Sequence, residues 1–254
     1  MNNVELPIEN RDDRRLQVVL AHAGVASRRH CAEMIRAGRV EVDGKIVREP
    51  GFRIEGAKAR LCVDGRTLRT QAPAHHRTIM LHKPKGLVCA VEDRFERTVF
   101  ECLRGIPERI VPVGRLDKES EGLLLLSSDG DFVNALTHPR YGQRKEYHVT
   151  VRGTLTRQIL AELRSGMVLE DDGTALCPVD VEVLDEDPDT PTRFLLRMVL
   201  HEGRNRQIRR MCEQVGLRVE RLVRTAIRNL RLPRDLKPGE WRDLTATELG
   251  KLNF

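Results

Sequence analysis

The sequence predicts an α+β fold in which a small N-terminal domain precedes a larger one. Segments with strand patterns outnumber helical segments and do not follow a regular βαβ rhythm, which favours a mixed, largely antiparallel sheet with flanking helices. A chain of 254 residues is long enough for a small and a medium domain, each with its own core. The short polar stretch Thr70–Arg77, TQAPAHHR, has the composition of a linker between them.

Composition excludes several classes of protein. No apolar run approaches the ~20 residues that a membrane helix needs, and the N-terminal segment has no apolar signal core, so we expect a soluble, cytoplasmic protein with no membrane partner. The six cysteines form no CxxC pair and the eight histidines include no HExxH motif. This pattern predicts reduced thiols and no metal site, with His75-His76 of the linker solvated.

Positive charge is concentrated in two segments of the chain. Residues 14–60 hold eleven Lys or Arg against five Asp or Glu, an excess that equals the net charge of +6. Residues 204–231 hold nine Arg against two Glu, so the remainder is acidic, with residues 185–189 forming a solvated loop. The two basic segments are separated by residues with no excess of positive charge. This arrangement predicts that the protein binds nucleic acid at two places.

The first basic segment predicts two helices followed by a hairpin. Apolar residues from Leu16 repeat at helical spacing up to Gly24, and Ser27 can cap a second helix that ends at Gly38. An alternating strand then leads into Asp43-Gly44, a hairpin signal. These elements form a small domain ahead of the linker.

Two arginines, Arg28 and Arg29, stand in the first turn of the second helix, where the helix dipole disfavours cations. Phosphate contact explains them, and a solvated helix face is the alternative. The pattern LQxxLAxAGxASRR…GRVxVDGKxV resembles the S-four RNA-binding domain, named for a small-subunit ribosomal protein. The resemblance implies an RNA-binding domain over residues 14–62, with candidate RNA contacts at Arg28, Arg29, Arg36, Arg39 and Lys45.

After a linker assigned to residues 63–77, the larger domain is expected over residues 78–250. Its segments follow the period-two or helical spacing of apolar residues. Strands are predicted at 79–82, 123–126, 145–151, 179–183 and 194–200, and helices at 131–137, 156–164 and 208–215.

One turn of this domain places a carboxylate beside the predicted core. In Val113–Asp131, VGRLDKESEGLLLLSSDGD, Asp117 lies on a polar turn just before the apolar run Leu123–Leu126. A carboxylate next to a core is costly unless it is used or paired. The alternative is a surface turn whose Asp accepts backbone hydrogen bonds. An arginine beside the apolar stripe of the 208–215 helix could reach inward as its bidentate partner or snorkel to water.

Four ordered motifs connect these segments to a known family. They resemble, over residues 14–246, the RsuA/RluB/RluE/RluF family of pseudouridine synthases, in which an S-four domain usually comes first. Ser120 and Ser127-Ser128-Asp129 depart mildly from the family pattern, which often has Thr and TND there. The motifs are KPKG at Lys83–Gly86, GRLDKESEGLLLLSSDG at Gly114–Gly130, KEYHV at Lys145–Val149 and GRNRQIRRM at Gly203–Met211.

The resemblance implies a role for individual residues. Asp117 matches the catalytic aspartate, Arg115 the arginine that helps displace the target base, Tyr147 the active-site tyrosine, and Arg209 the arginine that pairs with the aspartate. The reaction breaks the bond from uracil N1 to ribose and rejoins ribose to C5, so no cofactor or metal is required. Further RNA contacts are expected at Lys83, Arg204, Arg206 and Arg210.

The expected substrate is ribosomal RNA or a pre-ribosomal particle, bound by a monomer. The GRNRQIRRMCE segment and the ending GEWRDLT favour 23S large-subunit RNA, with 16S RNA or transfer RNA as alternatives. A non-catalytic assembly factor on the same fold would be expected to lack Asp117, Tyr147 or Arg209. A methyltransferase would need a glycine-rich cofactor loop, and neither Ser120–Gly122 nor Ser128–Gly130 has the GxGxxG shape.

Overall fold

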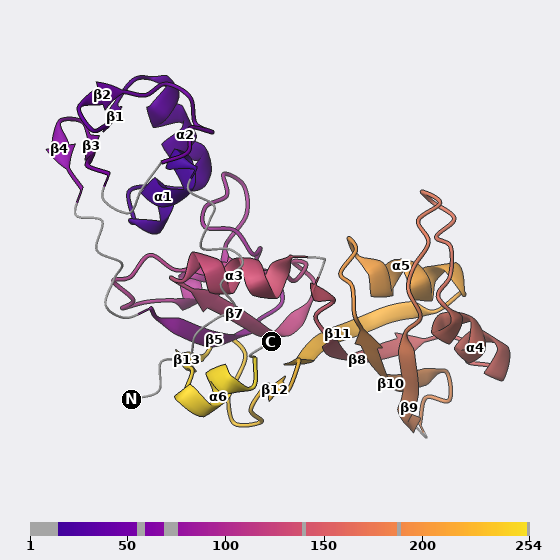
Figure 1. Cartoon of the computed structure of the whole chain (residues 1–254). Helices are drawn as coiled ribbons and strands as arrows, with labels where there is room; N and C mark the ends of the chain where they lie inside the picture. Colours follow the sequence, from indigo (N-terminus) through magenta and orange to yellow (C-terminus); the bar gives the residue numbers. More distant parts are fainter. Residues whose placement is uncertain (1–14, 55–58, 69–75, 139–140, 187–188, 253–254) are drawn as a thin grey trace. The chain divides into compact units, whose positions relative to one another are not determined.

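The chain folds into two compact units, shown in Figure 1. The structure, a computed structural model, describes residues 15–54, 59–68, 76–138, 141–186 and 189–252. The first unit comprises Met1–Arg77 with Ser128–Phe132 and Phe254, and the second comprises Thr78–Ser127 with Val133–Asn253. Residues 69–75 of the expected linker, which include His75, lie outside the described residues. In the described part of the chain, no helix has the length and apolar content of a membrane span.

The first unit has the two helices and the hairpin that the sequence predicts. The Ser27 hydroxyl accepts a hydrogen bond from the backbone N–H of His30 at 3.2 Å and so caps the second helix. Asp43 and Gly44 both have positive φ, as a two-residue hairpin requires. The helices are α1 (Leu16–His22) and α2 (Arg28–Arg36), and the sheet has the order β2-β1-β3-β4, with β1 (Val40–Val42), β2 (Lys45–Ile46), β3 (Leu61–Val63) and β4 (Arg66–Thr67).

The sheet of the first unit continues into the segment that was expected to be linker. Residues Arg66–Thr67 pair with Leu61–Val63 through a turn at Asp64-Gly65, where both residues again have positive φ. This turn has the same Asp-Gly chemistry as Asp43-Gly44. The paired structure of the first unit therefore extends beyond residue 62, at which the RNA-binding domain was expected to end.

Among the described residues, the second unit is built on a nine-stranded sheet, and its mixed, largely antiparallel pairing confirms the prediction. Its main path has the order β13-β5-β7-β11-β8-β10-β9, with β6 paired to β7 and β12 to β11. Among the described strands only β7 and β11 pair in parallel. The strands are β5 (Thr78–Lys83), β6 (Val111–Val113), β7 (Glu121–Ser127), β8 (Lys145–Arg152), β9 (Asp180–Glu186), β10 (Arg193–Leu200), β11 (Arg218–Ile227), β12 (Leu230–Arg231) and β13 (Trp241–Asp243).

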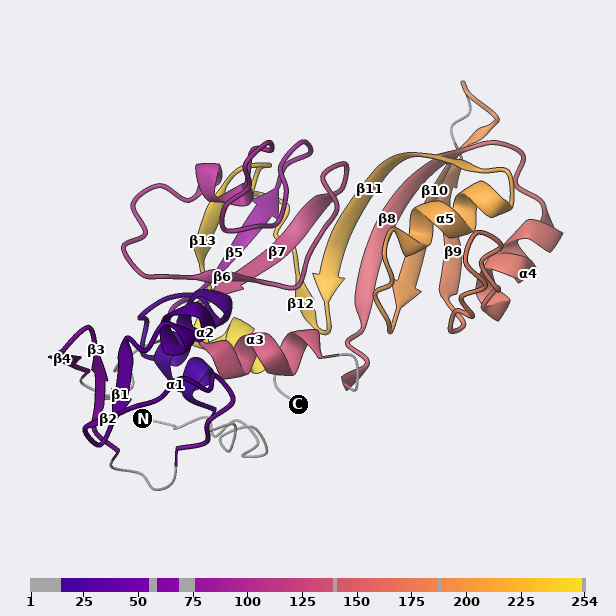
Figure 2. The same ribbon diagram turned by 90° about the horizontal axis from the view of Figure 1, so that it is seen from above.

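Helices pack on this sheet to form the core. A cluster over β8, β9 and β10 includes Leu163 of α4 (Arg157–Ser165) and Met211 of α5 (Gln207–Gln214), so both helices cover this part of the sheet (Figure 2). All four leucines of Leu123–Leu126 are fully buried, which confirms the predicted buried strand. The remaining helical elements of the described residues are η2 (Val99–Cys102), α3 (Gly130–Thr137) and α6 (Ala246–Gly250).

Candidate active site

A cavity of about 710 Å³ opens on the second unit, within the size range of small-molecule sites. It is lined by the connection between β6 and β7, by β8 and β11, and by the segment from the end of β10 into α5. These segments are far apart in the sequence, and the fold brings together the residues that the family motifs singled out. Asp117, Tyr147 and Arg209 all line the cavity, as do Arg115, Arg204 and Arg206.

The turn that follows Asp117 is held by a buried lysine. Lys83, at the end of β5, is fully buried, and its Nζ donates hydrogen bonds to the carbonyl oxygens of Ser120 at 2.8 Å, Pro84 at 3.0 Å and Lys118 at 3.3 Å. Burial is the main influence on this amine and lowers the pKa of Lys83. The prediction that Lys83 contacts RNA is therefore wrong, because its ammonium points at carbonyl oxygens beneath the surface.

Asp117 itself is half-buried on the connection between β6 and β7. Its backbone carbonyl accepts a hydrogen bond from the N–H of Ser120 at 3.0 Å, which closes the turn. Within the described residues its carboxylate accepts no hydrogen bond and forms no ion pair. The surface-turn interpretation required this side chain to accept hydrogen bonds from backbone donors, and it accepts none among the described residues. The carboxylate is therefore free to act on a substrate.

Arg209 approaches the same turn from α5. Its Nη2 donates a hydrogen bond to the Glu119 carbonyl at 2.9 Å, and its Nε is buried without a partner in the described structure. No ion pair joins Arg209 to Asp117 within the described residues, so the pairing that the resemblance implies is not formed here. Burial and the nearby Arg206 lower the pKa of Arg209, while Asp117 acts in the opposite direction.

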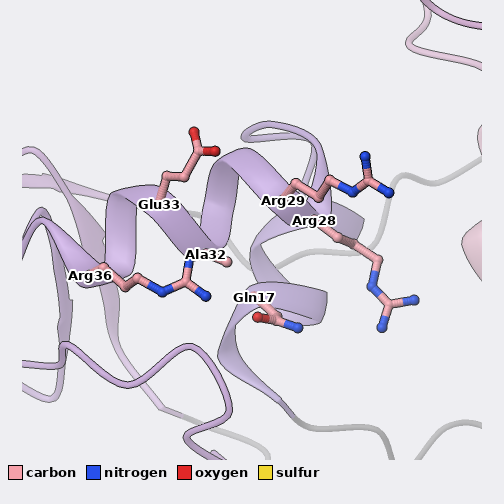
Figure 3. Close-up of a pocket in the computed structure, with 6 residues that line it drawn as sticks. All are labelled: Gln17, Arg28, Arg29, Ala32, Glu33 and Arg36. Atoms are coloured by element: carbon pink, nitrogen blue, oxygen red, sulfur yellow. The ribbon is translucent and has the colours of Figure 1, made fainter.

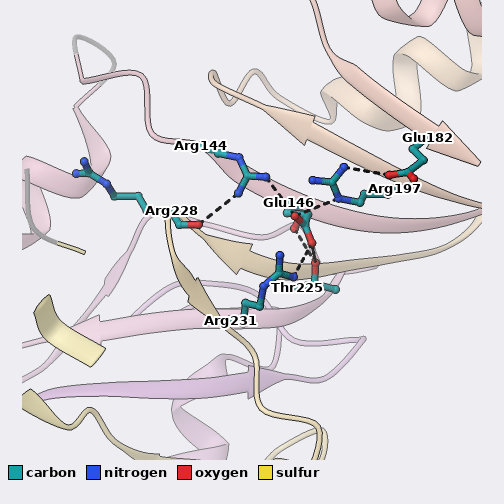
Figure 4. A network of polar contacts seen from close by, with 7 residues as sticks. All are labelled: Arg144, Glu146, Glu182, Arg197, Thr225, Arg228 and Arg231. Carbon is teal, nitrogen blue, oxygen red and sulfur yellow. Dashed lines mark hydrogen bonds and ion pairs between the residues drawn. The ribbon is translucent and has the colours of Figure 1, made fainter. Parts of the chain in front are cut away.

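Tyr147 lies on β8, and a network of arginines holds the opposite face of that strand. Because side chains alternate along a strand, Glu146 points away from the face that carries Tyr147. The Glu146 carboxylate is almost fully buried, and burial alone would raise its pKa, but the arginines around it outweigh burial and lower it. Figure 4 shows the ion pairs of Glu146, which join it to Arg144 at 3.3 Å, Arg197 at 3.2 Å and Arg231 at 3.0 Å.

These contacts link β8, β10 and β12, so Tyr147 stands on a braced strand. Glu146 is the buried member of this network, and without its arginine partners its charge would stay buried and unpaired, which is costly. The network therefore fixes the position of the strand that supplies Tyr147 to the cavity.

The cations predicted to contact RNA fall into two groups. Arg115, Arg204 and Arg206 are exposed where they line the cavity. Arg206 also adopts the left-handed conformation, with φ 48°, directly before α5. Such strained positions cluster at functional sites. All three remain placed to meet a polyanion, and Arg204 also forms an ion pair with the Glu202 carboxylate at 3.4 Å.

Two other predicted contacts are already paired. Arg210 does not line the cavity, and it forms ion pairs with Asp171 and, at 2.7 Å, with Asp172, which raise its pKa. Arg39 donates two hydrogen bonds, at 2.8 and 2.6 Å, to the carboxylate of Asp64. These acidic partners reduce the charge that Arg210 and Arg39 offer to RNA.

On the first unit, the exposed arginines of α2 line a groove. Figure 3 shows Arg28, Arg29 and Arg36 extending from α2, with Gln17 projecting from α1. Glu33 is the single acidic residue of this lining. Lys45, also predicted to contact RNA, is exposed on the hairpin of the same unit. A groove with three arginines and one carboxylate suits a phosphate backbone.

The described residues contain no cluster of three or more His, Cys, Asp or Glu side chains that could hold a metal ion. The polar side chains of the cavity include the carboxylates of Asp117 and Glu202, the phenol of Tyr147 and several cations, which can bind, stack against and electrostatically act on an organic substrate.

Comparison with protein families identifies the second unit. The model for RNA pseudouridylate synthases matches residues 77–214, which include every segment of the cavity lining except β11. The chain belongs to this family. It is an RNA pseudouridine synthase. The S4 domain model matches residues 14–58 of the synthase, over the helices and hairpin of the first unit.

Relatives extend the similarity to nearly the whole synthase. It is 40% identical over 239 residues to the ribosomal large subunit pseudouridine synthase B of Bacillus subtilis (strain 168), covering 94% of this chain and 95% of that protein. The protein of the same name from Salmonella typhimurium is 37% identical, with 94% and 81% covered. A crystal structure of a pseudouridylate synthase superimposes with a TM-score of 0.68 at 27% identity, covering 94% of this chain and 99% of that one.

Sequence reasoning missed two cations of the cavity. Lys145 stood inside the KEYHV motif without an assigned role, and Arg224 was counted only as part of a basic segment. Both line the cavity of the synthase, and Arg224 is only 2% exposed. Arg224 lies in the sequence between the apolar pairs Leu222-Val223 and Ala226-Ile227, and this position could have indicated that its side chain is buried.

Proposed function

We propose that the synthase converts a uridine of large-subunit ribosomal RNA to pseudouridine, acting as a monomer in the cytoplasm. The observation that carries the proposal is the cavity in which Asp117, Tyr147 and Arg209 meet. The relatives named for the large ribosomal subunit support the choice of RNA, because they match almost the full chain. Free ribosomal RNA and a pre-ribosomal particle both offer this substrate.

The geometry supports a separate role for each cavity residue when a uridine is flipped out of its helix. A base inside a helix cannot reach the cavity, so it must leave the stack at a cost of about a few kcal/mol. Arg115, exposed at the rim, fills the space that the base leaves. Tyr147 stacks on the uracil within the cavity. The reaction therefore takes place on a single extruded nucleotide.

Asp117 then faces the sugar of that nucleotide. An ionised carboxylate close to C1′ assists cleavage of the bond between N1 and C1′. Arg209 places a positive charge beside the same turn, where its Nη2 donates to the Glu119 carbonyl. The uracil turns, C5 bonds to C1′, the proton on C5 is released, and N1 takes up a proton. Reactant and product are isomers, so no further reactant is consumed.

Mapping pseudouridines in ribosomal RNA from a deletion strain tests this function. Carbodiimide treatment followed by primer extension is expected to lose one or more signals in large-subunit RNA. The wild-type gene is expected to restore the signal, and a gene encoding Asp117→Asn is expected not to. Intact signals in the deletion strain, or restoration by Asp117→Asn, would refute the proposal. A loss confined to small-subunit or transfer RNA would reject the choice of substrate.

The groove on α2 predicts a measurable share of RNA affinity. Replacing Arg28, Arg29 and Arg36 together by Gln is expected to weaken binding of the target RNA and to reduce the slope of log K against log salt by about three. The matched control is Arg157→Gln, an exposed arginine on α4. Binding titrations of both variants at several salt concentrations measure the affinity and the slope. An unchanged slope in the triple variant would show that RNA does not occupy this groove.

A further inference from the structure

Arg224 is a buried cation that the reaction described above leaves without a role. It lies on β11, which pairs in parallel with β7, and its partner in this pairing is Gly122. Its Nε donates a hydrogen bond to the Leu123 carbonyl at 2.8 Å, and its Nη1 donates to the Arg115 carbonyl at 3.4 Å. Its Nη2 is buried and has no hydrogen-bond partner in the described structure. The guanidinium is thus fixed on two sides and unsatisfied on the third.

Lys145 places a second cation at the same cavity. It begins β8 and pairs with Ile227 of β11, while its neighbour Tyr147 pairs with Arg224. The Lys145 Nζ donates one hydrogen bond, to the Gln143 carbonyl at 2.9 Å. An ammonium group has three protons to donate, so the bond to Gln143 leaves it able to bind a further acceptor.

No carboxylate compensates these two cations. Within the described residues, neither Lys145 nor Arg224 forms an ion pair with Asp or Glu. Arg224 is buried and Lys145 is half-buried. Burying a charge without a partner is costly, and groups left in this way occur at functional sites. Ser120 Oγ and Arg209 Nε, which also belong to residues of the cavity lining, are likewise buried without partners. The cavity is therefore prepared for a ligand that is rich in acceptors and carries or develops negative charge.

Uracil acquires such a charge during the reaction. When the bond between N1 and C1′ breaks, its electron pair stays with the ring and spreads over N1, O2 and O4. We propose that Lys145 and Arg224 stabilise this negative charge on the departing uracil. The charge disappears when C5 bonds to C1′, and the later release of the C5 proton is balanced by the proton that N1 takes up, so the pair acts only on the transient state. The inference rests on the proposed function, because that function places the ribose of the flipped uridine beside Asp117 and so leaves the uracil to face Lys145 and Arg224.

The protonation of Lys145 gives this role a pH dependence. Burial, followed by the positive charge of Arg224, lowers the pKa of Lys145 to about 8. Only the protonated amine carries the charge, so the rate is expected to fall as the pH rises through about 8. The other charged or titratable groups that line the cavity are Arg115, Asp117, His138, Tyr147, Cys177, His201, Glu202, Arg204, Arg206 and Arg209.

A substrate with a better leaving group separates this role from a structural one. Fluorine at C5 stabilises negative charge on the ring, so RNA with 5-fluorouridine at the target needs less help from the protein. In single-turnover assays of base cleavage at about pH 6.5, where Lys145 is charged, Lys145→Met is expected to slow uridine RNA about 100-fold and 5-fluorouridine RNA less than about tenfold. The matched control Lys237→Met, at an exposed lysine, is expected to change neither rate.

An equal loss on both RNAs would overturn the proposal, since a misplaced strand slows any leaving group alike. A weaker Kd with unchanged single-turnover rates would also overturn it and would assign the pair to a backbone phosphate. A wild-type enzyme that makes no pseudouridine in any ribosomal RNA would instead refute the proposed function.

Wild-type enzyme and a charge-preserving variant provide a test that does not depend on the folding of Lys145→Met. The rate of the wild type on uridine RNA is expected to fall above about pH 8, because Lys145 loses its proton there. Lys145→Arg keeps its charge at every accessible pH and is expected to retain its own rate through this range. A wild-type rate that is flat through pH 9, or a Lys145→Arg rate that falls in parallel with it, would overturn the proposal.

Discussion

Asp117→Asn is expected to lower the single-turnover rate of pseudouridine formation by at least about 10⁴-fold, the magnitude seen when a nucleophilic or charged member of a catalytic group is removed. The amide has the same size as the carboxylate but carries no charge to act at C1′. The measurement is the conversion of target RNA by purified enzyme, followed by nucleoside chromatography. Conversion within tenfold of wild type would contradict the role of Asp117.

Binding and stability provide the controls for this variant. The Asp117 carboxylate accepts no hydrogen bond in the described structure, so the substitution is expected to change the free energy of unfolding by no more than about 0.5 kcal/mol. The Kd for target RNA is expected to stay within about threefold of wild type, because phosphate contacts supply most of the affinity. Asp180→Asn, at an exposed aspartate of β9, is the matched control and is expected to retain full activity.

The residues around Asp117 show how far the sequence determines this site. The apolar run Leu123–Leu126 identified a buried strand, and the polar turn before it placed Asp117 at its edge; both features are present in the structure. Local pattern sufficed because a continuous apolar run and a turn are properties of neighbouring residues. The convergence of Asp117, Tyr147 and Arg209 on one cavity came from the family resemblance, since no local pattern reports contacts across a sheet.

Strand β11 shows why other parts could not be predicted. Its register shifts between Val219 and Arg221 and again between Arg224 and Ala226, so its apolar and polar residues do not alternate with period two. Its arginines therefore appeared as a basic segment rather than as a strand. The same limit applies to Lys83, because a sequence does not reveal that an ammonium is enclosed by three carbonyl oxygens.

The parallel contact between β7 and β11 also explains a glycine in the aspartate motif. Gly122 has φ +108°, and a Cβ at this position would lie 2.3 Å from the carbonyl oxygen and 2.6 Å from the nitrogen of Arg224. Backbone atoms cannot move aside as a flexible side chain can. The residue opposite Arg224 must therefore be glycine for β11 to reach the strand that follows Asp117.

Gly122→Ala is accordingly expected to destabilise the second unit by about 3 kcal/mol or more, because overpacking against backbone adds to an unfavourable φ. The matched control is Gly173→Ala, where φ is +69° but no atom lies within 4 Å of the added Cβ. The free energy of unfolding of Gly173→Ala is expected to fall by only about 1 kcal/mol, because this variant has the unfavourable φ but no clash. Urea unfolding of the full chain measures both, and equal losses would contradict the close approach of β11. Because Arg224 donates to the Leu123 and Arg115 carbonyls, separating the two strands also displaces the turn that carries Asp117, so activity is expected to fall at temperatures where Gly122→Ala remains folded.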